Sequence, residues 1–191
     1  MRRYTYDAKN YPLSEIALGS IQKHYPDVQD LSLLHEHVPS KKIGELAKII
    51  GKDLADTNFY KIFDKLLEDY VSLGEILVQR FGNIRINIPN QDKDGTVLPF
   101  HQGQWVGNGL GLRTVWLPFT DAYDSNSLQI VNLMDSRAIT NACKEWDYLR
   151  LQEECKKYCE PVNIKKGQFI LFTQEHIHGA AANRTGKTRM S

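Results

Sequence analysis

The sequence has few cysteines, and none of them is arranged for a disulfide framework. Cys143, Cys155 and Cys159 are odd in number and lie in one charged, helix-like segment. The CKKYC spacing at 155–159 is that of one helix face. Because no second Cys or His pair lies nearby, we interpret these thiols as helix-packing residues rather than zinc ligands.

The sequence also lacks an excess of charge of either sign and an apolar leader. Lys and Arg total 24, and Asp and Glu total 23, so no basic surplus argues for a nucleic-acid partner. Residues 1–13 contain no apolar h-region, and no apolar run approaches the ~20 residues of a membrane helix. We expect a cytoplasmic protein with a small-molecule partner and neither nucleic-acid nor membrane partners, and the sequence makes no prediction of oligomeric state.

The composition is that of one globular domain, which we assign to residues 1–191. The chain is 41% hydrophobic and 25% charged, which suffices for a packed core. The spacing of apolar residues predicts three helices in the first part of the chain, at 13–25, 41–52 and 56–80. We interpret residues 1–81 as a helical N-terminal brace. Its histidines are interpreted as surface residues, although LLHEHV at 33–38 also has the spacing to pair two of them on a strand: His24, His35 and His37.

From residue 82 onward the apolar pattern takes the period of a strand. Ile84, Ile86 and Ile88 alternate with Arg85 and Asn87, which gives one apolar and one polar face. Further strands are predicted at 113–119, 128–132 and 162–172, with a charged helical insertion at about 135–160. Successive strands with glycine-rich turns favour a mostly β fold with a helical brace (α+β), built as a sandwich or barrel.

The last residues, His176–Ser191, read HIHGAAANRTGKTRMS and combine histidines with an arginine. The NRTG turn at 183–186, with Gly186 free to take positive φ, predicts a hairpin that places the strands of His178 and Arg189 side by side. A metal ligand and a cation would then face one cavity.

Another histidine, His101, precedes His178 by 77 residues and lies in the segment HQGQW. Two histidines on facing strands, with an arginine on the strand beside the second, suit a divalent metal that shares a ligand with a carboxylate-bearing cosubstrate. His176 shares a predicted strand face with His178 and is a rival ligand.

Polar and aromatic side chains on neighbouring strands are candidates to line the same pocket. Arg85 and Asn87 would face a ligand if their strand lines a barrel, and an ordinary half-exposed strand explains them equally well. Thr114 and Trp116 share one face of the 113–119 strand.

Three motifs carry a resemblance to a known family: FHQGQW at 100–105, VWLPFTDAYDSNSLQIV at 115–131, and HGAAANRTGKTRMS at 178–191. With them the sequence resembles the Fe(II)/2-oxoglutarate-dependent oxygenases, in particular the phytanoyl-CoA dioxygenase-like branch found in carbohydrate gene clusters. The last motif is the most specific, because the family places an arginine at about this interval after the distal histidine.

The resemblance implies a double-stranded β-helix, a cupin-like jelly roll, over residues 82–191. It also implies Fe(II), 2-oxoglutarate and O2, with His101 and His178 holding the iron. Arg189 and Ser191 would bind the far carboxylate of 2-oxoglutarate, through a planar fork and a hydroxyl. The other candidates are Thr114, Asn87 and Trp116 for the cosubstrate, and Arg85, Gln104 and Trp105 for the substrate.

One part of the family's pattern is missing. The family has His-x-Asp or His-x-Glu, whereas Gly103 stands at the third position here. Gln104 is displaced by one residue and ligates only if the loop bulges. We expect position 103 to share the strand face of His101, so that an aspartate there would reach the metal without movement of the backbone.

Three functions follow, and the sequence leaves them open. The first is an oxygenase that hydroxylates an aliphatic C–H of a polar small molecule, such as a sugar or another secondary metabolite. The second is a halogenase, since a His-x-Gly resembles the radical halogenases in which chloride takes the vacated position. The third is a non-catalytic ligand-binding β-helix. The sequence ends at Ser191, inside the last expected strand, as expected of a chain shortened at its C-terminus.

Overall fold

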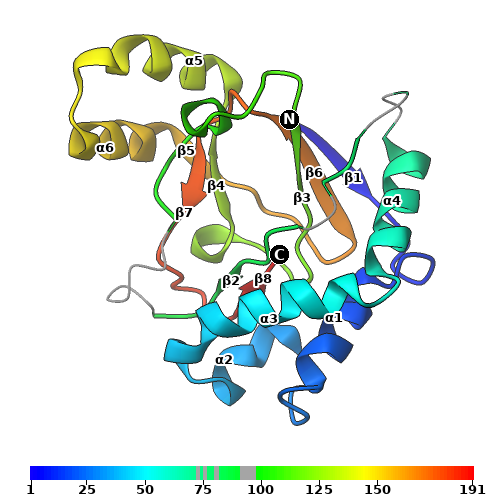
Figure 1. Cartoon of the computed structure of the whole chain (residues 1–191). Helices are drawn as coiled ribbons and strands as arrows, with labels where there is room; N and C mark the ends of the chain where they lie inside the picture. Colours follow the sequence, from blue (N-terminus) through cyan, green and yellow to red (C-terminus); the bar gives the residue numbers. More distant parts are fainter. Residues whose placement is uncertain (72–73, 75–76, 80–81, 91–97) are drawn as a thin grey trace.

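The computed structural model describes residues 1–71, 74, 77–79, 82–90 and 98–191, and it combines short antiparallel strands with helices (Figure 1). The helices are α1 (Leu13–Gln22), α2 (Leu34–His37), α3 (Ile43–Ala55), α4 (Phe59–Tyr70), α5 (Leu133–Ala142) and α6 (Tyr148–Tyr158). Short 3-10 helices are η1 (Leu31–Leu33), η2 (Ser40–Lys42), η3 (Gly103–Val106), η4 (Asp124–Asn126) and η5 (Cys143–Glu145). The strands are β1 (Arg2–Thr5), β2 (Ile86–Asn87), β3 (Arg113–Trp116), β4 (Leu128–Val131), β5 (Cys159–Pro161), β6 (Gln168–Thr173), β7 (His178–Ala180) and β8 (Arg189–Met190).

The strands form three antiparallel sheets with the orders β1-β6-β3, β5-β4-β7 and β2-β8. Alternate side chains of the first two sheets share one apolar cluster, which includes Trp116, Leu128, Ile130, Ile170 and Phe172. The two sheets therefore face each other across this cluster. Among the described residues the sheets remain open, and no closed barrel forms.

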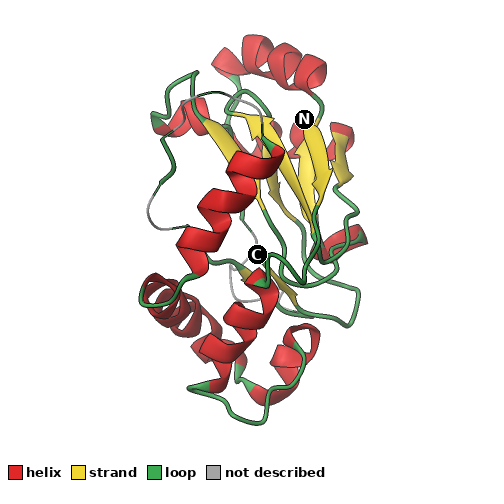
Figure 2. Cartoon of the chain, turned by 90° about the vertical axis from the view of Figure 1, so that its right-hand side faces the viewer, coloured by secondary structure: helices red, strands yellow, loops and turns green. Residues whose placement is uncertain are grey.

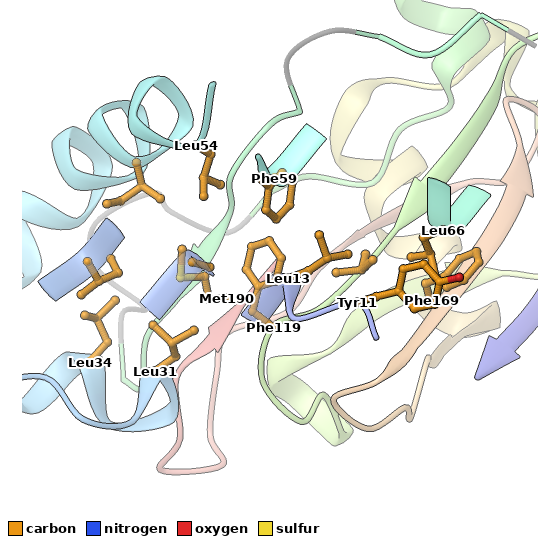
Figure 3. Packing of buried hydrophobic residues seen from close by; sticks show 14 of the residues in the cluster. Tyr11, Leu13, Leu31, Leu34, Leu54, Phe59, Leu66, Phe119, Phe169 and Met190 are labelled. Carbon is orange, nitrogen blue, oxygen red and sulfur yellow. The ribbon is translucent and has the colours of Figure 1, made fainter. Parts of the chain in front are cut away.

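The N-terminal helices pack on the strands through the largest apolar cluster (Figure 3). Phe169 of β6 and Met190 of β8 are fully buried in it, beside residues of α1, α3 and α4. The helices α5 and α6 lie at the other end of the strands, and Figure 2 shows helices at both ends. None of the described helices has the length and apolar character needed to cross a membrane.

Several predicted elements have different boundaries in the structure. The helix predicted over 56–80 ends at Tyr70, because Val71 takes extended dihedral angles (φ −114°, ψ 92°). Most of residues 72–81 lie outside the described residues, as do 91–97. The strand predicted over 113–119 ends at Trp116, before Pro118, which has no N–H to donate to a neighbouring strand.

The LLHEHV segment is helical, so the alternative in which its histidines pair on a strand is wrong. His37 is exposed, whereas His35 is half-buried and its Nδ1 lies 2.8 Å from the hydroxyl of Thr188. The predicted helical insertion at 135–160 contains α5 and α6, which lie between β4 and β5.

The predicted hairpin of β7 and β8 is also wrong. Strand β7 pairs with β4 and strand β8 pairs with β2, so the two strands enter different sheets. Gly186 does take positive φ, at 71°. The turn closes on Asn183, whose Nδ2 donates to the carbonyl of Lys187 at 2.7 Å and to that of Asn87 at 2.9 Å. This second bond directs the chain toward β2 rather than back along β7.

Candidate functional site

The structure brings His101 and His178 together as direct neighbours across an antiparallel bridge. The N–H of His101 donates to the carbonyl of His178 at 3.0 Å, and the N–H of His178 donates to the carbonyl of His101 at 2.9 Å. Residues opposed in this way project their side chains from the same face. The two imidazole centroids lie 4.4 Å apart, with their planes tilted by 49°.

The segment that carries His101 is held against β7 by a close backbone approach at Gly179. The N–H of Ala180 donates to the carbonyl of Leu98 at 2.8 Å. A Cβ atom at position 179 would lie 2.9 Å from that carbonyl oxygen and 3.1 Å from the nitrogen of Phe100. From α6, the Gln152 amide bonds both the N–H and the carbonyl of Phe100, at 2.8 and 2.9 Å. The position of His101 therefore depends on a glycine of β7 and a glutamine of α6.

We expect Gly179→Ala to destabilise the protein by about 1–3 kcal/mol, because the new methyl group meets backbone atoms that cannot rotate away. The measurement is the free energy of unfolding by denaturant titration. Gly109→Ala is the matched control, since a Cβ atom at position 109 has nothing within 4 Å. Equal stability of the two variants would contradict the close approach at Gly179.

Both histidines are held through Nδ1 by a backbone carbonyl. Nδ1 of His101 lies 2.9 Å from the carbonyl of Pro99, and Nδ1 of His178 lies 3.0 Å from that of His176. A carbonyl oxygen only accepts, so each Nδ1 carries a proton, and in the neutral form of the ring the lone pair lies on Nε2. Burial lowers the pKa of His178 to about 4, which keeps its ring neutral near pH 7. Backbone acceptors on Nδ1 are typical of metal-binding histidines.

Gly103 does not share a strand with His101, because it begins the helix η3. A Cβ atom at position 103 would overlap the side-chain oxygen of Gln174 and lie 2.6 Å from its Cδ. The prediction that position 103 lies on the strand face of His101 is therefore wrong, and an aspartate at position 103 requires the side chain of Gln174 to move. No group of three or more His, Cys, Asp and Glu side chains suited to a metal occurs within the described part of the chain.

Arg189 is buried, and its guanidinium is held by neutral groups. Its Nε donates to the carbonyl of Asn126 at 3.0 Å, and one terminal nitrogen donates to Ser191 Oγ at 2.8 Å. The guanidinium lies 5.9 Å from the centre of the Trp116 ring. No carboxylate among the described residues makes an ion pair with Arg189. Burial, followed by the charge of Arg85, lowers the pKa of Arg189 to about 10, so it remains charged at neutral pH.

The cosubstrate candidates form two groups. Ser191 Oγ also accepts a bond from Trp116 Nε1 at 3.2 Å, and Asn87 is opposite Arg189 in the β2–β8 register. Thr114 is opposite Phe172 in the β3–β6 register, and its hydroxyl accepts a bond from Gln174 at 2.9 Å.

Phe172 lies between the two groups. Its ring centroid is 5.0 Å from that of His178, and it packs in the same apolar cluster as Trp116. The metal candidates and the carboxylate candidates therefore border one set of facing strands.

The remaining candidates lie at the edges of this region. Arg85 is exposed, Gln104 is half-buried, and Trp105 is 36% exposed in η3. His176 lies in a turn rather than on a strand, where its Nδ1 is 2.9 Å from Thr173 Oγ1. It lines a cavity of about 350 Å³ to which neither His101 nor His178 contributes.

Residues 53–191, more than half of the chain, match the phytanoyl-CoA dioxygenase (PhyH) family. The chain belongs to the phytanoyl-CoA dioxygenase family. A comparison with curated proteins found no match. This family is a branch of the Fe(II)/2-oxoglutarate oxygenase superfamily, which confirms the resemblance read from the sequence. The match in this PhyH protein contains both histidines and Arg189, whereas β1, α1 and α2 precede it.

Proposed function

We propose that this PhyH protein is an Fe(II)/2-oxoglutarate-dependent oxygenase that hydroxylates an aliphatic C–H of a polar small molecule. The observation that carries the proposal is the His101–His178 bridge, with the two imidazole rings side by side and each Nδ1 bonded to a backbone carbonyl, so that Nε2 is the atom that would meet a metal. We further propose the double-stranded β-helix of the superfamily. It is supported by the two antiparallel sheets that face each other across an apolar cluster.

The two histidines fit a metal that has two protein ligands and several open positions. His101 and His178 would hold Fe(II) through Nε2. When bound, the iron supplies the oxidising chemistry, with 2-oxoglutarate and O2 as co-reactants. The protein's own part is to fix both rings: each Nδ1–H donates to a backbone carbonyl, which sets the tautomer and the ring orientation.

Arg189 and Ser191 would bind the far carboxylate of 2-oxoglutarate. A buried guanidinium without an anionic partner among the described residues is a strong site for an anion, because charge-assisted bonds are strengthened away from water. Ser191 adds a hydroxyl, which Trp116 and Arg189 both fix. Asn87 and Thr114 would contact the cosubstrate from the neighbouring strands.

The substrate side of the site is polar at its edge. Arg85, Gln104 and Trp105 offer a cation, an amide and a partly exposed aromatic face. Such groups suit a hydroxylated or charged small molecule, such as a sugar, better than a fatty one.

Halogenation is the second candidate function, because Gly103 provides no carboxylate. The side-chain oxygen of Gln174 lies where a side chain at position 103 would begin. An amide oxygen carries partial negative charge and opposes an anion beside it, which favours hydroxylation over chloride transfer. A ligand-binding protein without catalysis is the third candidate.

The proposal is tested by conversion of 2-oxoglutarate to succinate in the presence of Fe(II) and O2, with monosaccharides as trial substrates. We expect succinate to form with iron and not with zinc in its place. A product heavier by one oxygen identifies a hydroxylase, and a chlorinated product formed only with chloride identifies a halogenase. Binding of 2-oxoglutarate without formation of succinate would indicate the third candidate, a ligand-binding protein without catalysis.

A further inference from the structure

We propose that Gln174 takes the place of the missing third ligand side chain and closes the metal site beside Gly103. A side chain at position 103 and the side chain of Gln174 would occupy the same space. The presence of Gln174 therefore requires a glycine at position 103. The inference rests on the proposed function, in which His101 and His178 hold the metal. It concerns how this protein fills the space that a carboxylate would otherwise occupy.

The side chain of Gln174 is fixed at both ends of its amide. Its Oε1 accepts a bond from Asn108 Nδ2 at 3.1 Å, and its Nε2 donates to Thr114 Oγ1 at 2.9 Å. The residue is only 2% exposed. The Gly103 carbonyl accepts a bond from the N–H of Asn108 at 3.0 Å, which ties the η3 loop to the same group. The amide therefore has one defined orientation, with its oxygen toward Gly103.

The backbone that carries Gln174 is also anchored. The next residue, Glu175, makes an ion pair with Arg137 of α5, with Nε and Oε1 2.7 Å apart. The carbonyl of Glu175 accepts a bond from Gln102 Nε2 at 2.6 Å, and Gln102 is the residue between His101 and Gly103. The turn at 174–175 is thus bonded directly to the segment that carries the metal ligand.

This arrangement has a chemical consequence for the metal. A carboxylate at position 103 would bring one negative charge, whereas the amide of Gln174 is neutral. Imidazole binds a metal in its neutral form, so neither the two histidines nor Gln174 would offset the positive charge of the metal, which would then favour anionic ligands. The parent protein should therefore bind a metal more weakly than a variant that has an aspartate at position 103 and no glutamine at position 174.

The test compares four proteins: the parent, Gly103→Asp, Gln174→Ala, and the double variant. In the metal-free proteins, Gly103→Asp should lower the Tm by about 4–10 °C, because the buried side chain of Gln174 is expelled and its bonds to Asn108 and Thr114 are lost. In the Gln174→Ala background the same change should lower the Tm much less. Such non-additivity is the signature of two residues that compete for one space.

Metal binding gives an independent readout, with Co(II) as the probe under anaerobic conditions. We expect the double variant to bind Co(II) roughly tenfold or more tightly than the parent, since the restored carboxylate is a metal ligand. Gly103→Asp with Gln104→Ala is the matched control, because it removes a neighbouring glutamine that does not fill the space. This control should not recover the stability.

Additive Tm changes, or a single Gly103→Asp variant as stable as the parent, would overturn the proposal. Equal recovery by Gln104→Ala would also overturn it. Absence of Co(II) binding in every variant, with the Tm coupling intact, would instead remove the proposed metal function while the exclusion between positions 103 and 174 stands.

Discussion

Replacement of Arg189 by alanine is expected to weaken 2-oxoglutarate binding by about a hundredfold or more, which corresponds to roughly 3 kcal/mol. The physical reason is that the carboxylate would lose a buried, charge-assisted partner that no other described cation replaces. The measurement is calorimetric titration of 2-oxoglutarate into the zinc-loaded protein without O2. Metal affinity in the absence of 2-oxoglutarate should change little.

Two variants serve as controls for the Arg189 experiment. Arg85→Ala removes the same charge from an exposed side chain just before β2 and should retain 2-oxoglutarate affinity within a few fold. Arg189→Lys keeps the charge and loses the planar fork, so its affinity should lie between those of the parent and the alanine variant. Unchanged affinity in Arg189→Ala, in a protein that is still folded, would place the cosubstrate elsewhere.

Replacement of either His101 or His178 by alanine is expected to abolish measurable metal binding. With only two imidazoles available, loss of one leaves a single neutral ligand, which holds a divalent ion weakly. The loss of metal affinity should exceed the ~10–100-fold loss that follows removal of a group that only hydrogen-bonds to a metal ligand. Calorimetric titration of Co(II) or anaerobic Fe(II) measures it, and the Tm of each metal-free variant tests whether it is folded.

His176→Ala is the informative comparison for the histidine pair. His176 is buried and His178 is half-buried, yet His176 lies in a turn and bonds Thr173 rather than meeting His101. Metal affinity should therefore be retained in this variant. Loss of the metal in His176→Ala together with retention in His178→Ala would reverse the ligand assignment.

Short-range features of this fold follow from the sequence. The first helices, the helical insertion and the strand after the Lys166–Gly167 turn appear close to their predicted positions, because apolar period and turn residues are local signals. The motif intervals also identify the family. Whether His101, His178 and Arg189 act as proposed remains a prediction, although the structure does place the two histidines side by side.

Other features depend on contacts that a local pattern does not encode. The turn at 183–186 has the composition of a hairpin, yet Asn183 bonds Asn87, nearly a hundred residues earlier, and the strands diverge. In the sequence, Gly103 predicts an empty space where the family's carboxylate would lie, because no neighbouring residue in the chain is expected to fill it. The residue that does so, Gln174, is brought there by β6, and no pattern in the sequence singles it out.

Two adjacent residues of β8 face different parts of the protein: Arg189 faces the proposed carboxylate site, and Met190 faces the apolar cluster of the N-terminal helices. The side chain of Arg189 is directed to Ser191 and Trp116, whereas Met190 is buried with Leu31 and Leu34 of the N-terminal part (Figure 3). The preceding residue, Thr188, donates its N–H to the carbonyl of Ser32 at 2.8 Å.

The border of the sequence family and the border of the folding unit therefore differ in this protein. The family match begins at residue 53, whereas Leu31, Ser32 and Leu34, which contact the β8 segment, lie before it. A chain that began at residue 53 would lose Leu31 and Leu34 from the cluster around Met190 and the bond from Thr188 to Ser32, although β8 would keep its pairing with β2. In this protein the proposed carboxylate site therefore depends on residues 31–34, which lie outside the family match.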